Sequence, residues 1–237
     1  MVHMDASAET ILEGLDDAQR AAATTVNGPV RIIAGAGAGK TRTVTRRIAY
    51  ACATGEWDPR RALAVTFSVK AAAEMRSRLS QLEVDGAVKA ATFHSAALHQ
   101  IRRVWPDLCE GPFPHISRQP RELVARSLRR VTTMQVDDET VRNLQAKINW
   151  CKISLVSPND YQRVCAATHR QPPAGLEPDQ FTDVYQAYET EKTARGEIDF
   201  DDILLIACHV LESYDEASAA IRSSIGWLTV DEYQDVS

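Results

Sequence analysis

The chain has 237 residues, of which 44% are hydrophobic and 25% are charged, and its formal net charge at pH 7 is -5. These values exclude a disordered or fibrous chain and leave room for one large domain or two smaller ones. No apolar run approaches the length that crosses a bilayer, and the N-terminus lacks a signal-peptide pattern. The five cysteines are scattered and never in CxxC spacing, so we expect neither a disulfide framework nor a zinc site, and a reducing cytoplasm as the compartment.

Charge is distributed unevenly along the chain. Residues 40–80 carry nine Lys and Arg against three Asp and Glu, whereas residues 177–237 carry three against fifteen. A basic first half is compatible with a bound polyanion, although solvated helix faces account for many such arginines. On charge alone, nucleic acid binding and an ordinary solvated surface are both open.

The first predicted helix begins at a cap formed by Asp16 or Asp17 and ends before Gly28. The apolar residues 30–34 that follow predict a strand. Gln19 lies on the helix, and its side-chain amide offers one donor and one acceptor, which suits the edge of adenine. A glutamine on a helix surface is the simpler interpretation of that residue.

The next segment has the pattern of a phosphate-binding loop, and it consists in chain order of Ala34, Gly35, Ala36, Gly37, Ala38, Gly39, Lys40 and Thr41. The glycines allow several backbone N–H groups to point at one anion, and the positive end of the following helix faces the same point. Lys40 can reach the β and γ phosphates of a nucleotide, and the Thr41 hydroxyl can bind magnesium. Because Ala34 stands where the general pattern has glycine, the match depends on Gly39, Lys40 and Thr41 and on the order of strand, loop and helix.

Two further strand–helix units follow the loop. Residues 62–67 predict a buried parallel strand, and Ser68 caps a helix with a core face of Ala72, Met75, Leu79 and Leu82. Residues 88–92 predict another strand. Units of this kind predict a doubly wound α/β fold with a parallel sheet, in which ligands gather at the carboxyl ends of the strands.

Five side chains fall at the ends of these two strands, namely Thr66, Phe67, Thr92, Phe93 and His94. A phenylalanine that projects from the rim of a sheet can stack on a base. At this position a core role is more common, and both interpretations of Phe67 and Phe93 stay open.

From about residue 98 to residue 195 the sequence shows only helical signals, which predicts an all-helical insertion in the α/β domain. The expected helices cover residues 95–104, 120–133, 138–153, 158–168 and 178–194. The predicted organisation is a first part of the core (1–97), a helical region (98–195) and a second part of the core (196–237). Asp199, Asp201 and Asp202 open the next helix, and solvated charges at its N-terminus are favoured over a metal site.

The last segment, residues 226–235, is an apolar strand that runs into Asp231 and Glu232. A P-loop ATPase needs this arrangement opposite its loop. Asp231 can hold magnesium together with Thr41, and Glu232 can orient or deprotonate the attacking water. A surface acidic turn is the alternative, and the buried-type residues before Asp231 argue against it.

Together these motifs resemble those of the UvrD/Rep/PcrA-like DNA helicases of superfamily 1, most closely the actinobacterial UvrD-like branch. The matching segments, in the family's order, are LDDAQR (15–20), AGAGAGKTR (34–42), AVTFSVKAAAEMRSR (64–78), TFHS (92–95), DFDD (199–202) and VDEYQD (230–235). The resemblance implies a RecA-like P-loop NTPase fold and a cytoplasmic enzyme that uses ATP and Mg2+. It also implies 3′ to 5′ movement on single-stranded DNA and duplex unwinding, with DNA repair as the expected setting.

The resemblance further implies roles for individual residues. Gln19 and Arg42 correspond to the contacts with adenine. The helical region corresponds to the subdomain that touches DNA at a duplex junction. The residues that correspond to contacts with single-stranded DNA are Thr66, Phe67, Ser68, Phe93, His94 and Ser95.

Relative to this family, the chain ends before motif III and before the second motor domain. We therefore expect an N-terminal fragment with little turnover of its own, whose sheet lacks a central strand and covers Ile32, Val65 and Leu228 poorly. Two other classes stay open. One is a small-molecule kinase or assembly ATPase, which the long separation between Lys40 and Asp231 disfavours, and the other is a module that binds nucleotide or a protein partner without turnover.

Overall fold

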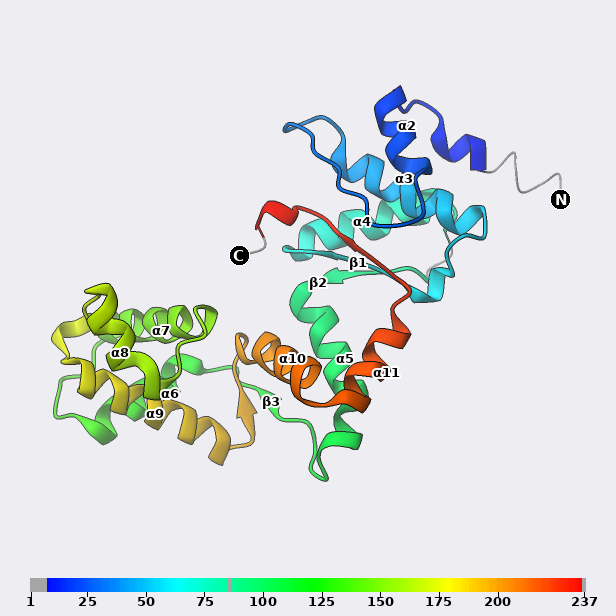
Figure 1. Ribbon diagram of the computed structural model, residues 1–237. Helices are drawn as coiled ribbons and strands as arrows, with labels where there is room; N and C mark the ends of the chain where they lie inside the picture. The colour runs from blue at the N-terminus through cyan, green and yellow to red at the C-terminus, as the bar shows by residue number, and fades with distance from the viewer. Residues whose placement is uncertain (1–7, 85–86, 236–237) are drawn as a thin grey trace. The chain divides into compact units, whose positions relative to one another are not determined.

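The computed structural model describes residues 8–84 and 87–235 (Figure 1). The chain folds into two compact units, of which unit 1 consists of residues 1–100 and 214–237 and unit 2 of residues 101–213. All five cysteines in these units are free thiols. In the described part of the chain, no helix is both long and apolar enough to cross a membrane.

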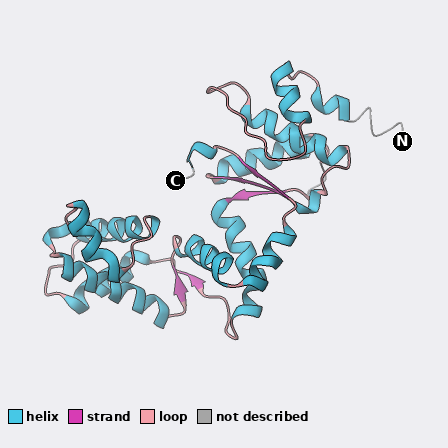
Figure 2. Cartoon of the chain, in the orientation of Figure 1, coloured by secondary structure: helices cyan, strands magenta, loops and turns pink. Residues whose placement is uncertain are grey.

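Unit 1 contains a three-stranded parallel sheet with the strand order β2–β1–β5 (Figure 2). The strands are β1 (Ala62–Thr66), β2 (Lys89–Thr92) and β5 (Trp227–Val230). The register pairs Thr66 with Thr92 and Val65 with Val230. The predicted parallel sheet is therefore confirmed, and the carboxyl ends of its strands lie side by side at one edge.

The helices that begin in unit 1 are α2 (Asp17–Thr24), α3 (Lys40–Ala53), α4 (Val69–Gln81), α5 (Phe93–Leu108) and α11 (Asp215–Ser224), and residues 8–12 are also helical. Apolar side chains of α3 and α4 pack against the sheet, among them Val44, Ile48, Met75 and Leu79. The core face predicted for α4 is confirmed, except that Leu82 is only half-buried.

The strand predicted over residues 30–34 does not form. A strand exists through hydrogen bonds to a neighbour, and no described strand pairs with this segment. Ile33 is 79% exposed and Leu228 on β5 is 59% exposed, so the expected poor cover of Leu228 is confirmed. The same expectation is wrong for Val65, which is 3% exposed because β1 is the middle strand, and Ile32 packs partly against the core.

Unit 2 consists mainly of the helices α6 (Pro120–Val131), α7 (Asp138–Ile153), α8 (Pro158–Thr168), α9 (Pro178–Ala194) and α10 (Asp202–Ser213). Local caps set the starts of two of them. The Asp137 side chain accepts a hydrogen bond from the Thr140 backbone N–H at 2.7 Å, and the Ser157 hydroxyl accepts one from the Asp160 N–H at 3.2 Å. The limits predicted for α7, α8 and α9 are confirmed.

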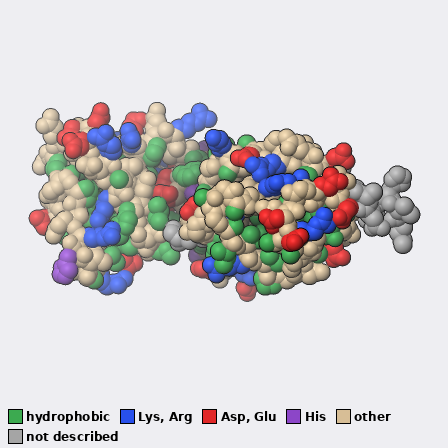
Figure 3. Space-filling view, turned by 90° about the horizontal axis from the view of Figure 1, so that it is seen from above, with side chains coloured by type: hydrophobic (Ala, Val, Ile, Leu, Met, Phe, Trp, Pro, Cys, Tyr) green, Lys and Arg blue, Asp and Glu red, His purple; other side chains and the backbone are tan. Residues whose placement is uncertain are grey.

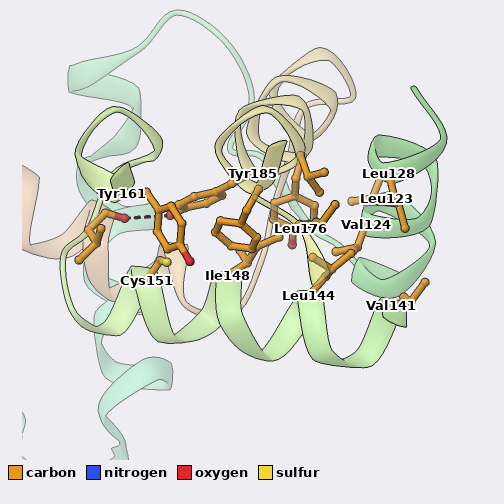
Figure 4. Close-up of a cluster of buried hydrophobic side chains, with 14 of the residues drawn as sticks. Leu123, Val124, Leu128, Val141, Leu144, Ile148, Cys151, Tyr161, Leu176 and Tyr185 are labelled. Carbon is orange, nitrogen blue, oxygen red and sulfur yellow. Dashed lines mark hydrogen bonds between the residues drawn. The ribbon is translucent and has the colours of Figure 1, made fainter. Parts of the chain in front are cut away.

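One core of apolar and aromatic side chains joins α6, α7, α8 and α9. Figure 4 shows Leu144 and Ile148 of α7 pointing into the layer that Tyr185 occupies. The Tyr161 ring lies 4.4 Å from the Phe181 ring, centre to centre. This core gives unit 2 its own hydrophobic interior, separate from that of unit 1.

The region predicted as all-helical also contains a short strand. β3 (His115–Ile116) pairs in parallel with β4 (Glu197–Ile198), and the His115 N–H donates to the Gly196 carbonyl at 2.8 Å. Strands of two residues are too short to show an alternating pattern in the sequence. Because β4 and α10 belong to unit 2, that unit extends to residue 213, beyond the limit predicted at residue 195.

Candidate functional site

The glycine-rich segment forms a tight loop directly before α3. Gly37 and Gly39 have φ values of +76° and +79°, in the left-handed region that glycine adopts without strain. The Ala38 N–H donates to the Gly35 carbonyl at 3.3 Å, which closes a turn within the loop. Because a Cβ atom added at Gly35 or Gly37 would meet nothing within 4 Å, the loop has open space beside it for a phosphate group.

Gln19 lies against this loop. Its Nε2 atom donates to the Ala38 carbonyl at 3.0 Å, and its Oε1 atom accepts from the Asp16 N–H at 3.2 Å in a capping box. A Cβ atom at Gly39 would lie 3.1 Å from Nε2, so a larger residue there would displace the Gln19 side chain, and the φ of +79° favours glycine. Gln19 is therefore more than a helix-surface glutamine, since it links α2 to the loop.

Arg42 is at the same end of α3. Its guanidinium donates to the Gly14 carbonyl at 2.9 Å, and its Cβ atom lies 4.0 Å from the position of a Cβ at Gly39. The structure thus brings Arg42 and Gln19 together beside Gly39. Both side chains can change partners, because the bonds they make are exposed.

Lys40, Thr41 and Asp231 form the centre of the site. The Lys40 ammonium donates to the loop's own carbonyls of Ala34 at 3.2 Å and Gly35 at 3.3 Å. The Thr41 hydroxyl donates to Asp231 Oδ2 at 3.4 Å. These contacts join two segments that lie 190 residues apart in the sequence.

Asp231 is held at the tip of β5. Its backbone N–H donates to the Val65 carbonyl at 2.9 Å, and the residue is 5% exposed. Burial raises the pKa of its carboxyl above the ordinary value, and the neighbouring Glu232 charge acts in the same direction. A buried carboxylate beside a hydroxyl offers two oxygen ligands on one side, which fits a Mg2+ ion that keeps water and phosphate as its other ligands.

Glu232 has a φ of +53°, a value that costs energy for any residue with a side chain. Its N–H donates to Asp231 Oδ1 at 3.1 Å, and the Gln234 amide donates to the Glu232 carboxylate. Strained backbone of this kind is concentrated at functional sites. Gln234 belongs to the segment VDEYQD (230–235), but that motif did not predict its contact with Glu232.

At the same edge of the sheet, Phe67 and Phe93 lie together after β1 and β2. Their ring centres are 4.9 Å apart with planes tilted by 42°, and Phe67 is 44% exposed. Thr66, by contrast, is 1% exposed, so its side chain is part of the interior. The pair therefore presents an aromatic surface at the carboxyl ends of β1 and β2.

Ser68, His94 and Ser95 surround this aromatic pair in the sequence. The Ser68 hydroxyl caps α4 by accepting from the Ala71 N–H at 3.0 Å. The Thr92 hydroxyl donates to the Ser95 hydroxyl at 2.9 Å and accepts from the Ser95 N–H at 3.2 Å. Burial lowers the pKa of His94, which favours its neutral form.

The acidic segment at residues 199–202 is not a set of solvated charges. Asp199 is 5% exposed, and its carboxylate accepts hydrogen bonds from Lys152 at 2.5 Å, Lys192 at 3.0 Å and the Tyr188 hydroxyl at 2.9 Å. The prediction of solvated charges is wrong for this residue because Lys152 and Lys192 come from distant positions in the chain. Glu189, Asp199 and Asp202 lie close enough to share a metal ion, but the two ammonium groups already fill that position.

The uneven charge of the sequence does not produce one basic surface on the face shown in Figure 3. Lys and Arg side chains are interspersed there with Asp and Glu side chains. Charge alone therefore does not locate a nucleic acid on this face.

The glycine-rich loop before a helix, with a buried aspartate at the tip of a parallel strand opposite it, defines a P-loop NTPase domain. The profile of the UvrD/REP helicase N-terminal domain matches residues 15–237. The chain therefore belongs to the UvrD/REP helicase family.

Several curated relatives are similar in sequence to nearly the whole chain. The ATP-dependent DNA helicase UvrD2 of Mycobacterium tuberculosis (strain ATCC 25618 / H37Rv) is 39% identical, over 99% of this chain and 34% of that protein. The ATP-dependent DNA helicase PcrA of Leuconostoc citreum is 30% identical, over 98% of this chain and 30% of that protein. PcrA of Bacillus subtilis (strain 168) is 28% identical, over 96% of this chain and 30% of that protein. The chain thus spans about a third of the length of these relatives.

Proposed function

We propose that this chain is the ATP-binding N-terminal motor domain of an ATP-dependent DNA helicase. The complete protein would couple ATP hydrolysis to 3′ to 5′ movement on single-stranded DNA and to unwinding of duplexes. The observation that carries the proposal is the contact of 3.4 Å between the Thr41 hydroxyl and Asp231 Oδ2, which joins the loop to the acidic strand tip. The relatives named UvrD2 and PcrA support it, because they are ATP-dependent DNA helicases.

In the nucleotide site, Lys40 exchanges the carbonyls of Ala34 and Gly35 for phosphate oxygens. Thr41 and Asp231 would hold Mg2+, which neutralises phosphate charge when it is bound. Glu232 accepts a proton from the attacking water and orients it. The other residues assigned to the nucleotide are Gln19 and Arg42 at the base and Ala36, Gly37, Ala38 and Gly39 in the loop.

In the DNA site, the Phe67 and Phe93 rings stack on bases of a single strand. Backbone groups of Thr66, together with Ser68, His94 and Ser95, contact the same strand. We also propose that unit 1 is the RecA-like core and unit 2 is its inserted subdomain, which meets DNA at duplex junctions. Residues 196–213 are assigned to unit 2 rather than to the core, because they pack with that unit.

A nucleotide titration with and without magnesium tests the proposal. The chain should bind a fluorescent ATP analogue, and Lys40→Ala should abolish that binding. Asp231→Asn should remove the magnesium-dependent part of the affinity, whereas Glu232→Gln should keep the affinity. In the longer protein, Glu232→Gln should abolish turnover stimulated by single-stranded DNA. Nucleotide binding without any such turnover in the longer unsubstituted protein would instead favour the alternative, a nucleotide- or partner-binding module.

A further inference from the structure

Gly14 lies in the short segment that leads from the helical residues 8–12 into α2, and a side chain there would meet Arg42. A Cβ atom added at Gly14 would lie 2.8 Å from Nη2 of Arg42, so close that one of the two groups must move. At every other glycine within the described part of the chain, the nearest atom would be 3.1 Å away or more. Gly14 also has a φ of +71°. Glycine at this position therefore allows the Arg42 guanidinium to come close to the backbone.

The close approach is a hydrogen bond from the guanidinium to the backbone. Arg42 Nη2 donates to the Gly14 carbonyl at 2.9 Å. A guanidinium has five N–H donors, so this bond leaves other donors for a ligand. An arginine side chain loses much rotamer freedom when a ligand fixes it, and a bond made beforehand lowers that loss. The bond to Gly14 thus prepares Arg42 for binding.

A second arginine fixes the segment that carries Gly14. Arg46 lies one turn further along α3, and its Nη1 atom donates to the carbonyl of Ile11 and, at 2.8 Å, to the carbonyl of Glu13. The side chains of Ile11 and Leu12 are buried. Because the segment is bonded to α3 on one side and packed in the interior on the other, the Gly14 carbonyl has a fixed place relative to α3.

Gly14 also connects the two side chains that border the phosphate-binding loop. Gln19 follows five residues later, and its Nε2 atom donates to the Ala38 carbonyl at 3.0 Å. Arg42 reaches the same part of the loop from α3, because its Cβ atom lies 4.0 Å from the position of a Cβ at Gly39. This short stretch of backbone therefore holds Arg42 and Gln19 beside each other.

We propose that Gly14 is a positioning residue of the nucleotide site, which holds the Arg42 guanidinium where it meets the base of ATP. The inference rests on the proposed function, which assigns Arg42 and Gln19 to the base. Gly14 acts through its carbonyl and through its lack of a side chain. Alanine at this position would push the guanidinium aside, and because Nη2 is the far end of a flexible side chain, this movement costs the fold little. The effect of the crowding therefore falls on binding of the base.

The test compares Gly14→Ala with Gly55→Ala in the 237-residue chain. Gly55 follows α3 at the end away from the loop, has a φ of +77°, and an added Cβ there would meet no described atom within 4 Å. Both variants thus carry similar backbone strain, but only Gly14→Ala crowds Arg42. Displacement of a fluorescent ATP analogue measures the affinity for ATP and for inorganic tripolyphosphate, which has no base.

Gly14→Ala should weaken ATP binding about tenfold, the loss typical of one hydrogen bond to a charged group. It should leave the affinity for tripolyphosphate unchanged. Gly55→Ala should keep both affinities, and the melting temperatures of the two variants should fall by similar amounts. Equal ATP affinity in the two variants would overturn the proposal. A parallel loss of tripolyphosphate affinity in Gly14→Ala would overturn it too, because the effect would then not be at the base.

A double-mutant cycle shows whether Gly14 acts through Arg42. Arg42→Ala should itself weaken ATP binding about tenfold. Adding Gly14→Ala should change the affinity no further, because the group that it displaces is already absent. Additive losses would show that Gly14 acts by another route and would overturn the proposal. Failure of the unsubstituted chain to bind ATP is a separate outcome, which would overturn the proposed function and this inference with it.

Discussion

Replacing Lys152 by methionine should lower the free energy of unfolding of unit 2 by about 3 to 5 kcal/mol. The Lys152 ammonium is buried and lies 2.5 Å from Asp199, 2.6 Å from Asp202 and 3.0 Å from Glu189. Methionine keeps the apolar stem of the side chain and removes its charge. The three carboxylates would then face Lys192 alone.

The magnitude follows from the charge that is left behind. Unsubstituted, the network has two ammonium groups against three carboxylates, and the Tyr188 hydroxyl donates a further bond to Asp199. Removing one partner of a buried pair leaves an uncompensated charge out of contact with water, and this charge is the source of a cost of roughly 3 to 5 kcal/mol. The free energy of unfolding of a typical domain is only about 5 to 15 kcal/mol, so this loss would remove a large part of the stability of unit 2.

Urea unfolding followed by circular dichroism measures this loss, because urea does not screen charges as guanidinium would. Arg126→Met is the matched control, since it removes an exposed pair with Glu122 at 2.5 Å on α6. It should cost at most about 1 kcal/mol. Equal losses in the two variants would refute the reasoning, because the buried network would then contribute no more than a surface pair.

The pH dependence gives an independent check. Burial by itself raises the pKa of Asp199, but Lys152 and Lys192 outweigh it and hold that pKa well below its ordinary value. A carboxyl with a depressed folded pKa stabilises the fold above its unfolded pKa of about 3.9, and that stability is lost as the pH falls through the folded value. Asp199→Asn should therefore lose less stability than the unsubstituted chain between about pH 5 and pH 2.

Three further substitutions probe unit 1. Gly39→Ala should destabilise the chain by about 1 to 2 kcal/mol, because alanine is strained at a positive φ. It should also weaken nucleotide binding, because its Cβ would crowd Gln19. Thermal melting measures the first effect and a nucleotide titration the second. Phe67→Ala should weaken binding of single-stranded DNA by roughly 1 to 3 kcal/mol in an anisotropy titration, and unchanged affinity would limit the Phe67 ring to packing on Phe93. Ser68→Ala should cost about 1 kcal/mol in urea unfolding through loss of the α4 cap, with nucleotide affinity unchanged.

The elements predicted best from the sequence are those whose ends depend on local signals. α7 and α8 begin where Asp137 and Ser157 provide side-chain caps, and both ends of each helix match the prediction. β1 could be predicted because a buried parallel strand is a continuous apolar run. The phosphate-binding loop could also be predicted from the sequence, since Gly39, Lys40 and Thr41 lie in one short segment.

The features that the sequence did not reveal depend on partners far away in the chain. Residues 30–34 are apolar enough for a strand, but a strand also requires a neighbour, which composition does not encode. Asp199 has the sequence context of a solvated charge, because the lysines that neutralise it are at positions 152 and 192.

The strained backbone at Glu232 leads to a final prediction. Glu232 has a φ of +53°, and Glu83, which follows α4 and is exposed, has a φ of +54°. Holding a residue with a side chain in this region costs about 1 to 2 kcal/mol. Glycine removes that cost but loses about 0.5 to 1 kcal/mol through its greater freedom when unfolded. Each substitution by glycine should therefore leave the stability equal or slightly raised.

The two variants should differ in function alone. Glu83→Gly should keep turnover stimulated by single-stranded DNA in the longer protein, whereas Glu232→Gly should lose it, because it removes the carboxylate that we propose acts on water. Thermal melting of the 237-residue chain and steady-state ATPase assays of the longer protein measure the two effects. If Glu232→Gly melted well below Glu83→Gly, the contact of Glu232 with Gln234 would be structural, and the strain at this position would need no catalytic explanation.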